Sequence, residues 1–205
     1  MKLLLLGANG RAGREILSQG LAAGNSITAL VRTKNRLSDV SHPRLQVCAG
    51  DVCDSRFLEP IIAGHDAVIS VLGPRLPTKL ACEIYSKSAR SIVAAMLKTD
   101  VSRLLVTSTA LLFPSSKLSD QFLRWVAKQN IVHAGLMEKH IISSSLEWTI
   151  VRCGFLTNSN DMNLRSANNL FPEGGGSISR AALAKFFINE ASDPNCLGQV
   201  VGLSN

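Results

Sequence analysis

The stretch Leu3-Leu4-Leu5-Leu6-Gly7-Ala8-Asn9-Gly10-Arg11-Ala12-Gly13 decides how the rest of this sequence is interpreted. The leucines extend an apolar run over residues 2–6, which is typical of a buried β-strand. Residues 10–23 carry Ile16, Leu17 and Leu21 at helical spacing, and Gly24 follows where a helix is expected to end. A strand, a glycine-rich turn and a helix in this order predict the first half of a βαβ unit.

The three glycines follow the spacing G-x-x-G-x-x-G, and each has a physical use at such a turn. Gly7 permits a sharp change of direction, Gly10 allows a phosphate to approach the backbone, and Gly13 allows close packing of helix on strand. The free N–H groups at the helix start then face an anion. We interpret the loop as a dinucleotide site; the alternative is a tight turn that binds nothing. The candidate contacts are Gly7, Asn9, Gly10, Arg11, Ala12 and Gly13.

The remaining chain alternates short apolar runs with amphipathic segments, which predicts a mostly parallel sheet. Further strands are expected at residues 26–31, 45–49, 67–72, 103–107, 148–151 and 199–202. Helices are expected at residues 54–63, 80–98 and 180–191, with one long helix or two at 120–144. Together these predict an α/β fold, a single doubly wound Rossmann domain over residues 1–205 with strand order 3-2-1-4-5-6-7 and helices on both faces. Residues 157–176 are the least regular stretch, and we expect residues 155–178 to form a substrate-side loop.

Composition and charge exclude several classes of protein. The 205 residues are 46% hydrophobic and 18% charged, which excludes a disordered chain. The net charge is +7, but the basic residues are dispersed and only one Tyr and two Trp accompany them, so we expect no nucleic-acid partner. The small anionic ligand predicted at the glycine loop accounts equally well for a local basic excess.

No apolar run approaches the about 20 residues that span a bilayer, so we expect no membrane partner. The N-terminal run stops at Gly7, too early for a secretory signal. The five cysteines form no C-x-x-C pair and no cluster with histidine, so we expect no metal site and reduced thiols. These features predict a cytoplasmic protein. The sequence leaves monomer and dimer open.

The second expected strand ends at Val31-Arg32, 25 positions after Gly7. Many NAD-binding sites place a carboxylate near this point to bind the ribose hydroxyls. Arg32 stands here instead, with Lys34 and Arg36 close behind. A guanidinium binds the 2′-phosphate of NADP through charge-assisted hydrogen bonds, so Arg32 and Arg36 favour NADP(H) over NAD(H). The alternative is a solvated basic strand end.

With these residues in place, the chain resembles the short-chain dehydrogenase/reductase superfamily. Within it, the chain is similar to the atypical NmrA-like members and their biliverdin reductase B (flavin reductase) relatives. The resemblance covers nearly the whole chain. It is carried by Gly7-Ala8-Asn9-Gly10, Leu30-Val31-Arg32, Gly50-Asp51-Val52, Asp66-Ala67-Val68-Ile69 leading to Leu72-Gly73, Ser88-Ala89-Arg90, Thr107-Ser108 and Leu146-Glu147-Trp148-Thr149-Ile150-Val151-Arg152.

This resemblance implies further site residues. Asp51 and Val52 are expected to contact the adenine, and Leu72 and Gly73 to line the adenosine ribose. Arg75 is expected near the phosphates. Ser108 is expected beside the nicotinamide as the catalytic candidate, with Arg152-Cys153-Gly154 bordering the ring; a plain strand-closing hydroxyl is the alternative for Ser108.

The chain departs from the family pattern where a proton donor is expected. Typical members use Tyr-x-x-x-Lys, but the only tyrosine is Tyr85, and Ala89 stands four positions later. Many atypical relatives carry Lys or His four positions before the residue that matches Glu138, where this chain has Ala134. His133 lies about 100° away on the helix, so we interpret it as a helix-packing residue. Biliverdin reductase relatives carry a His where this chain has Phe155.

Cys153 is expected to be a buried, inert thiol and not a redox group. We expect an NADPH-dependent reductase that transfers hydride to a flavin, a quinone or a similar planar acceptor. Phe155, Leu111 and Phe113 are predicted to form an apolar wall for that acceptor. The alternatives are a non-catalytic NADP(H) sensor acting through a protein partner and, third, a sugar-nucleotide epimerase or dehydratase.

Overall fold

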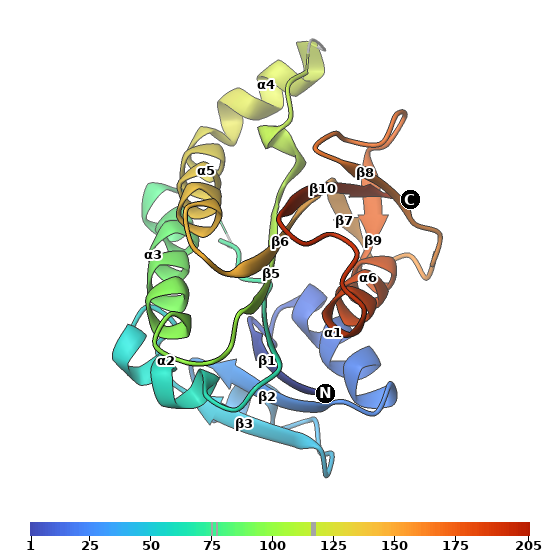
Figure 1. The fold of residues 1–205 in the computed structure, drawn as a ribbon. Helices are drawn as coiled ribbons and strands as arrows, with labels where there is room; N and C mark the ends of the chain where they lie inside the picture. Colours follow the sequence, from blue (N-terminus) through green and yellow to red (C-terminus); the bar gives the residue numbers. More distant parts are fainter. Residues whose placement is uncertain (75, 77, 116–117) are drawn as a thin grey trace.

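A computed structural model describes residues 1–74, 76, 78–115 and 118–205. Its centre is an eight-stranded sheet in the order β3-β2-β1-β4-β5-β6-β10-β8 (Figure 1). The parallel strands are β1 (Lys2–Leu6), β2 (Ser26–Val31), β3 (Leu45–Ala49), β4 (Ala67–Ser70), β5 (Arg103–Thr109), β6 (Glu147–Cys153) and β10 (Gln199–Ser204). The predicted order is confirmed for these seven, with β10 as the seventh strand.

The helices form a layer on each face of the sheet (Figure 1). One face carries α1 (Arg11–Ala22) and α6 (Arg180–Ser192). The other carries α2 (Ser55–Ile62), α3 (Lys79–Met96) and α5 (Lys128–Ile142). The segment expected as one helix or two is two: α4 (Leu118–Val126) ends just before Ala127, whose ψ of 18° breaks the helical path into α5. Short 3-10 turns, η1 (Lys34–Leu37) and η2 (Ala110–Leu112), follow β2 and β5.

Strand β1 shows why the apolar runs are nearly continuous. Leu3 and Leu5 pack into the core beneath α1 and α6, whereas Leu4 and Leu6 pack beneath α2 and α3. Successive side chains on a strand point to opposite faces, so a strand covered on both faces needs apolar residues at every position. The sheet therefore separates two cores.

Residues 155–178 are not the plain loop that the sequence predicted. They contain β7 (Phe155–Thr157), β8 (Arg165–Asn168) and the first two residues of β9 (Ser177–Ser179). Strands β7 and β9 form a separate parallel pair, and β8 joins the main sheet antiparallel to β10. Gly202 allows the segment that follows β8 to pack closely on β10, because a Cβ at Gly202 would lie 2.1 Å from the carbonyl oxygen of Leu170. The sequence analysis did not predict β8, because its residues are mostly polar and three of them are exposed on an edge of the sheet.

None of the helices in the described ranges combines the length and apolar character that a membrane-spanning helix requires.

Candidate dinucleotide site

The glycine loop lies at the carboxyl end of β1, where the chain turns into α1. Gly7 has a φ of +88°, and a Cβ there would lie 2.9 Å from the carbonyl oxygen of Val71. A Cβ at Gly13 would lie 2.1 Å from the Gly7 carbonyl oxygen, so helix and turn are in direct backbone contact. Gly10 caps α1 without any side-chain hydrogen bond. The first-turn N–H groups thus lack a side-chain cap, and no side chain stands at Gly10 in front of them, which fits a pyrophosphate.

The other loop candidates flank this cradle. Asn9 and Ala12 are half-buried, and Arg11, the first residue of α1, is exposed. No acidic residue occupies the first turn of α1, so nothing there repels an anion.

A basic segment follows β2 at the same edge of the sheet. The side chains of Arg32, Lys34 and Arg36 are exposed, and within the described residues none of them makes an ion pair or a hydrogen bond. The carboxylate of this segment, Asp39, is bound by Arg14 of α1, whose Nη1 lies 2.5 Å from Oδ2. The Arg14 guanidinium lowers the pKa of Asp39. Asp39 is thus paired with Arg14, whereas the side chains of Arg32 and Arg36 have no ionic partner among the described residues.

Arg14 also holds the segment in place. Its Nη2 donates to the carbonyl oxygen of Arg36 at 2.8 Å, which ties η1 to α1. The glycine loop and the basic segment are therefore connected through one side chain. The sequence analysis did not single out Arg14, because its partners lie 22 and 25 residues further along the chain.

The remaining cofactor candidates follow β3 and β4 at this edge. Asp51 accepts a hydrogen bond from the backbone N–H of Cys53 at 2.9 Å, and Val52 is half-buried. Leu72 is half-buried, and Gly73 is exposed beside the hydroxyl of Tyr85. The strands β3, β2, β1 and β4 are neighbours and parallel, so their carboxyl ends bring these residues to the same edge of the sheet. Arg75 lies outside the described residues.

Ser108 belongs to a buried polar cluster. Its hydroxyl donates to Oε1 of Glu138 on α5 at 2.5 Å. Arg152 donates to the same carboxylate from Nε at 3.0 Å and from Nη2 at 2.6 Å. Ser108 and Arg152 are register partners on β5 and β6, so their side chains leave the same face toward α5. The sequence pointed to Ser108 and Arg152 separately, but not to their common partner.

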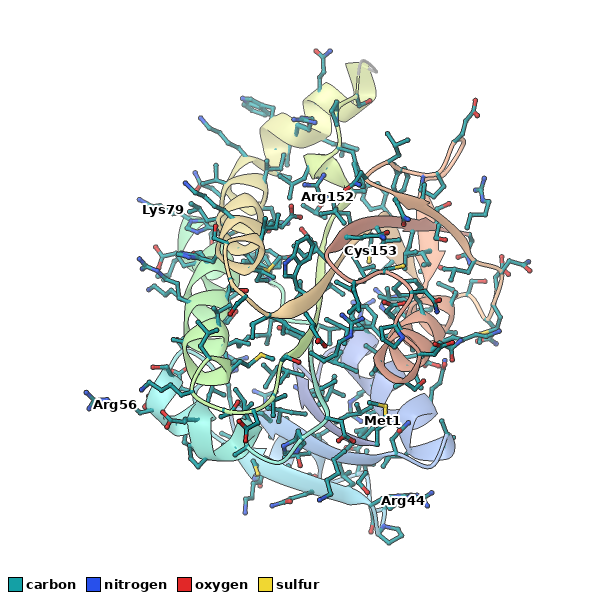
Figure 2. All side chains as sticks on the ribbon, in the orientation of Figure 1. Met1, Arg44, Arg56, Lys79, Arg152 and Cys153 are labelled. Carbon is teal, nitrogen blue, oxygen red and sulfur yellow. The ribbon has the colours of Figure 1, made fainter. Side chains whose placement is uncertain are left out.

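An aromatic pair extends this cluster. The Arg152 guanidinium lies 4.6 Å from the ring centroid of Phe113, and the Phe113 and Phe171 centroids are 6.1 Å apart. Figure 2 shows Arg152 and Cys153 near the middle of the molecule. Of the predicted acceptor wall, Phe113 is buried, Leu111 half-buried and Phe155 exposed. Phe171, which the sequence analysis missed, is the residue that packs on Phe113.

Two buried side chains with an ionisable proton, Cys153 and Tyr85, lie close to this region. Burial raises the pKa of the Cys153 thiol to about 12 and that of the Tyr85 hydroxyl to about 12. Both groups are therefore protonated near neutral pH, in agreement with an inert Cys153. His133 contacts the hydroxyl of Ser86 on α3 at 3.0 Å, a helix-packing position, and Ala134 beside it is fully buried. Tyr85, on α3, does not supply the proton donor of typical short-chain reductases.

Comparison with known proteins shows the family to which the chain belongs. The sequence pattern of a family described as NAD(P)H-binding matches residues 7–194, which is most of the chain. A curated relative, the photosystem II assembly factor Ycf39 of Synechocystis, is 22% identical over 160 residues. The match includes 76% of this chain but only 45% of that protein, so the chain spans less than half of its length.

Two solved structures show how far the fold is shared. A short-chain dehydrogenase/reductase from Veillonella parvula in complex with NADP has a TM-score of 0.79 and 20% identity, covering 100% of this chain and 94% of that one. A Streptococcus pneumoniae protein provisionally named an NADH-flavin reductase has a TM-score of 0.78 and 22% identity, covering 100% and 99%. At such identities the likeness establishes the fold.

Proposed function

The chain belongs to the NAD(P)H-binding family, and from that premise we propose that it is an NADPH-dependent reductase of a flavin, a quinone or a similar planar acceptor. The observation that carries the choice of acceptor is the position of its only tyrosine. Tyr85 is buried on α3, and Ala89 stands four positions later in place of a lysine, so the chain lacks the Tyr-x-x-x-Lys pair that protonates a carbonyl substrate. A reduced flavin or quinone takes its proton from water, so these acceptors need no protein acid.

In this proposal the cofactor supplies the hydride when bound, and the chain supplies binding and orientation. The loop Gly7–Gly13 holds the pyrophosphate, and Arg32 with Arg36 holds the 2′-phosphate. Asp51, Val52, Leu72 and Gly73 surround the adenosine, and Ser108 and Cys153 border the nicotinamide. Residues 1–205 act as one domain, with 155–178 on the acceptor side. Orientation of donor and acceptor in one groove is a proximity effect.

The preference for NADPH is tested by replacing one cation. Arg32→Gln removes a charge-assisted contact to the 2′-phosphate, and we expect NADPH to bind about 10- to 100-fold more weakly while NADH is unaffected. Arg56→Gln is the matched control, because Arg56 is an exposed arginine on α2. Fluorescence titration of each cofactor measures the effect. Equal losses for NADPH and NADH would contradict the assignment of Arg32.

Turnover is tested by following NADPH oxidation with FMN, a small quinone and biliverdin, and with NADH as the control donor. The flavin reductase assignment of the S. pneumoniae structure supports FMN as the first acceptor to try. Turnover with NADPH well above NADH supports the reductase.

A second candidate is a non-catalytic NADP(H) sensor that acts through a protein partner. The observation that favours it is that the Ser108 hydroxyl donates to Glu138, so Ser108 does not offer a free proton at the carboxyl end of β5. The name of the Synechocystis relative, an assembly factor, agrees with a role of that kind. Tight NADPH binding without turnover for any acceptor would support the sensor.

A further inference from the structure

The cluster of Ser108, Glu138 and Arg152 fixes where each proton lies. A guanidinium can only donate hydrogen bonds, and Arg152 donates to both oxygens of Glu138. Both oxygens therefore act as acceptors, as in an ionised carboxylate. The proton in the 2.5 Å contact between Ser108 and Glu138 then belongs to the serine. Ser108 and Glu138 are 7% and 4% exposed, so water does not compete effectively for either group.

This arrangement limits what Ser108 can do for a ligand. Its single proton is directed at Glu138, and only lone pairs of Oγ remain for other contacts. In the described part of the chain no other group donates to Oγ. We propose that Ser108 accepts a hydrogen bond from an amide N–H of a bound ring, and that Glu138 is the positioning residue that sets this polarity. The inference rests on the proposed reductase function, because it places such a ring at the carboxyl end of β5.

Contacts of Arg152 with Phe113 and Glu138 keep Glu138 as the acceptor in its hydrogen bond with Ser108. Arg152 is stacked 4.6 Å from the centroid of Phe113, so its guanidinium has a fixed plane against Glu138. A protonated Glu138 would give up one acceptor oxygen and lose part of the two-point contact with Arg152. Ser108 therefore acts toward a bound ring as a hydrogen-bond acceptor and not as a proton donor.

Two groups carry the required amide N–H. One is the carboxamide of the nicotinamide, and the other is the ring lactam of a flavin acceptor. The first case is tested with an analogue that lacks the carboxamide N–H. Reduced 3-acetylpyridine adenine dinucleotide phosphate has a methyl group in place of the amide nitrogen. The second case is tested by comparing FMN, which carries the lactam N–H, with a quinone that has no N–H group.

The test measures each ligand with wild type and with Ser108→Ala. If the carboxamide is the donor, wild type prefers NADPH over the analogue, and Ser108→Ala reduces that preference about 3- to 10-fold, the value of one hydrogen bond. If the flavin lactam is the donor, Ser108→Ala raises KM for FMN by a similar factor and leaves KM for the quinone unchanged. If Ser108→Ala changes neither the preference for NADPH over the analogue nor the KM for FMN relative to the quinone, the inference is wrong. Failure of wild type to bind NADPH overturns the proposed function together with the inference.

The role of Glu138 is tested by Glu138→Gln. The new amide can donate to Ser108, which frees the serine proton, so we expect the same loss of preference as in Ser108→Ala. Ser108→Thr retains the hydroxyl and is expected to retain the preference even if Glu138→Gln folds poorly. Thr107→Val is the control, because Thr107 makes no side-chain hydrogen bond within the described residues and its side chain leaves the opposite face of β5. Full preference in a folded Glu138→Gln, or its loss in Ser108→Thr, contradicts the proposed polarity.

Discussion

At the scale of single residues, the glycines of the loop differ in what they contribute. Gly7 is required by its backbone angle, with φ at +88°. Gly13 is required by space, because a Cβ there would meet the backbone of the preceding turn. A Cβ at Gly10 would lie 3.3 Å from the Gly7 carbonyl oxygen, a tight but less severe contact. The motif thus combines a turn requirement with a packing requirement.

Gly13→Ala tests the packing requirement. The added methyl would lie 2.1 Å from the Gly7 oxygen and 2.8 Å from Cα of Ala8, and backbone atoms cannot move aside as a side chain can. We expect about 1–3 kcal/mol of destabilisation in urea unfolding, with weakened NADPH binding. Gly176→Ala is the control, because nothing lies within 4 Å of its added Cβ. Equal stability of the two variants would contradict the contact.

The buried thiol and phenol make stability depend on alkaline pH. Burial raises the pKa of Cys153 from 9.0 to about 12 and that of Tyr85 from 10.0 to about 12. A group with a raised folded-state pKa contributes its full stability below the unfolded pKa and loses it as pH rises toward the folded one. We therefore expect the urea midpoint to fall between pH 9 and 12. Cys153→Ala and Tyr85→Phe should each reduce this dependence; an unchanged pH profile in both would contradict it.

At the scale of elements, local sequence signals explain where several helices begin. Asp54 caps α2, with its carboxylate accepting from the N–H groups of Arg56 at 2.9 Å and Phe57 at 3.2 Å. The expected start of this helix at residue 54 agrees with that cap. The break between α4 and α5 carries no such signal, since neither Gly nor Pro occurs near Ala127. The sequence alone therefore did not distinguish between one long helix and two helices over residues 120–144.

Asp54→Ala tests the cap of α2. Two backbone N–H groups lose their acceptor, so we expect a loss of about 1 kcal/mol in the free energy of unfolding. Asp54→Asn keeps an acceptor oxygen and should retain most of that stability. Urea unfolding of the two variants beside wild type measures the difference. A loss in Asn as large as in Ala would show that charge, and not the hydrogen bonds, is responsible.

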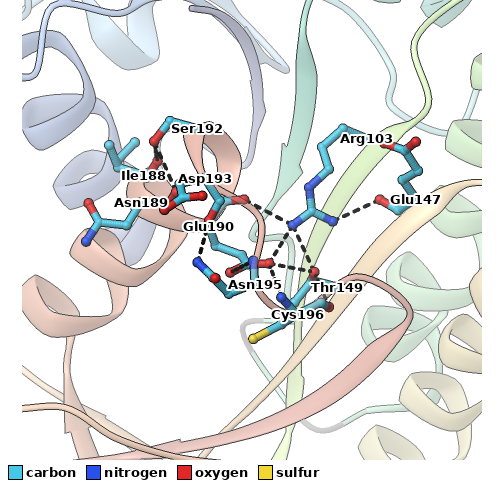
Figure 3. A network of polar contacts seen from close by, with 10 residues as sticks. All are labelled: Arg103, Glu147, Thr149, Ile188, Asn189, Glu190, Ser192, Asp193, Asn195 and Cys196. Atoms are coloured by element: carbon cyan, nitrogen blue, oxygen red, sulfur yellow. Dashed lines mark hydrogen bonds and ion pairs between the residues drawn. The ribbon is translucent and has the colours of Figure 1, made fainter.

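At the scale of the whole molecule, a buried ion pair connects elements at the amino ends of β5 and β6, whereas the candidate dinucleotide site lies at the carboxyl ends of the strands. Figure 3 shows the residues of this ion-pair cluster. Arg103, at the start of β5, donates from Nη2 to Oε1 of Glu190 on α6 at 2.9 Å. The same carboxylate accepts from the backbone N–H groups of Asn195 at 3.1 Å and Cys196 at 2.8 Å. Thr149 of β6 accepts from Arg103 at 2.9 Å. The cluster thus joins two strands, α6 and the turn before β10.

Glu190→Gln tests this connection. The variant leaves the Arg103 charge buried without its counter-charge, which is expected to cost about 3–5 kcal/mol. NADPH affinity of the folded variant should be unchanged, because the cluster lies at the amino ends of β5 and β6 and the candidate dinucleotide site at the carboxyl ends of the strands. Glu59→Gln is the control, since the Glu59–Lys98 pair is exposed and such a pair contributes about 0–1 kcal/mol. Similar unfolding free energies for the two variants would contradict the role assigned to Glu190.

The sequence by itself determined the features that depend on neighbouring residues. The glycine loop, the doubly buried strand of leucines and the alternation of strands and helices led to the parallel order from β3 to β10. They did so because turn geometry and hydrophobic period act over a few residues. The family relation followed from the same motifs, and the match over residues 7–194 bears it out. The individual contacts of Arg32, Asp51 and the other cofactor candidates stay predictions, and Arg75 lies outside the described residues.

Only the tertiary structure decided which distant residues meet. Ser108 and Glu138 are 30 positions apart, and Arg103 and Glu190 are 87 apart, so no local pattern relates them. Their meeting depends on strand register and on which turn of a helix faces the sheet. The same holds for Phe171 against Phe113 and for β8 at the edge of the sheet, whose polar residues gain their order by pairing with β10. Local chemistry thus indicated the glycine turn and the candidate dinucleotide site, while long-range packing placed the Ser108 hydroxyl where it donates its proton to a hydrogen bond with Glu138.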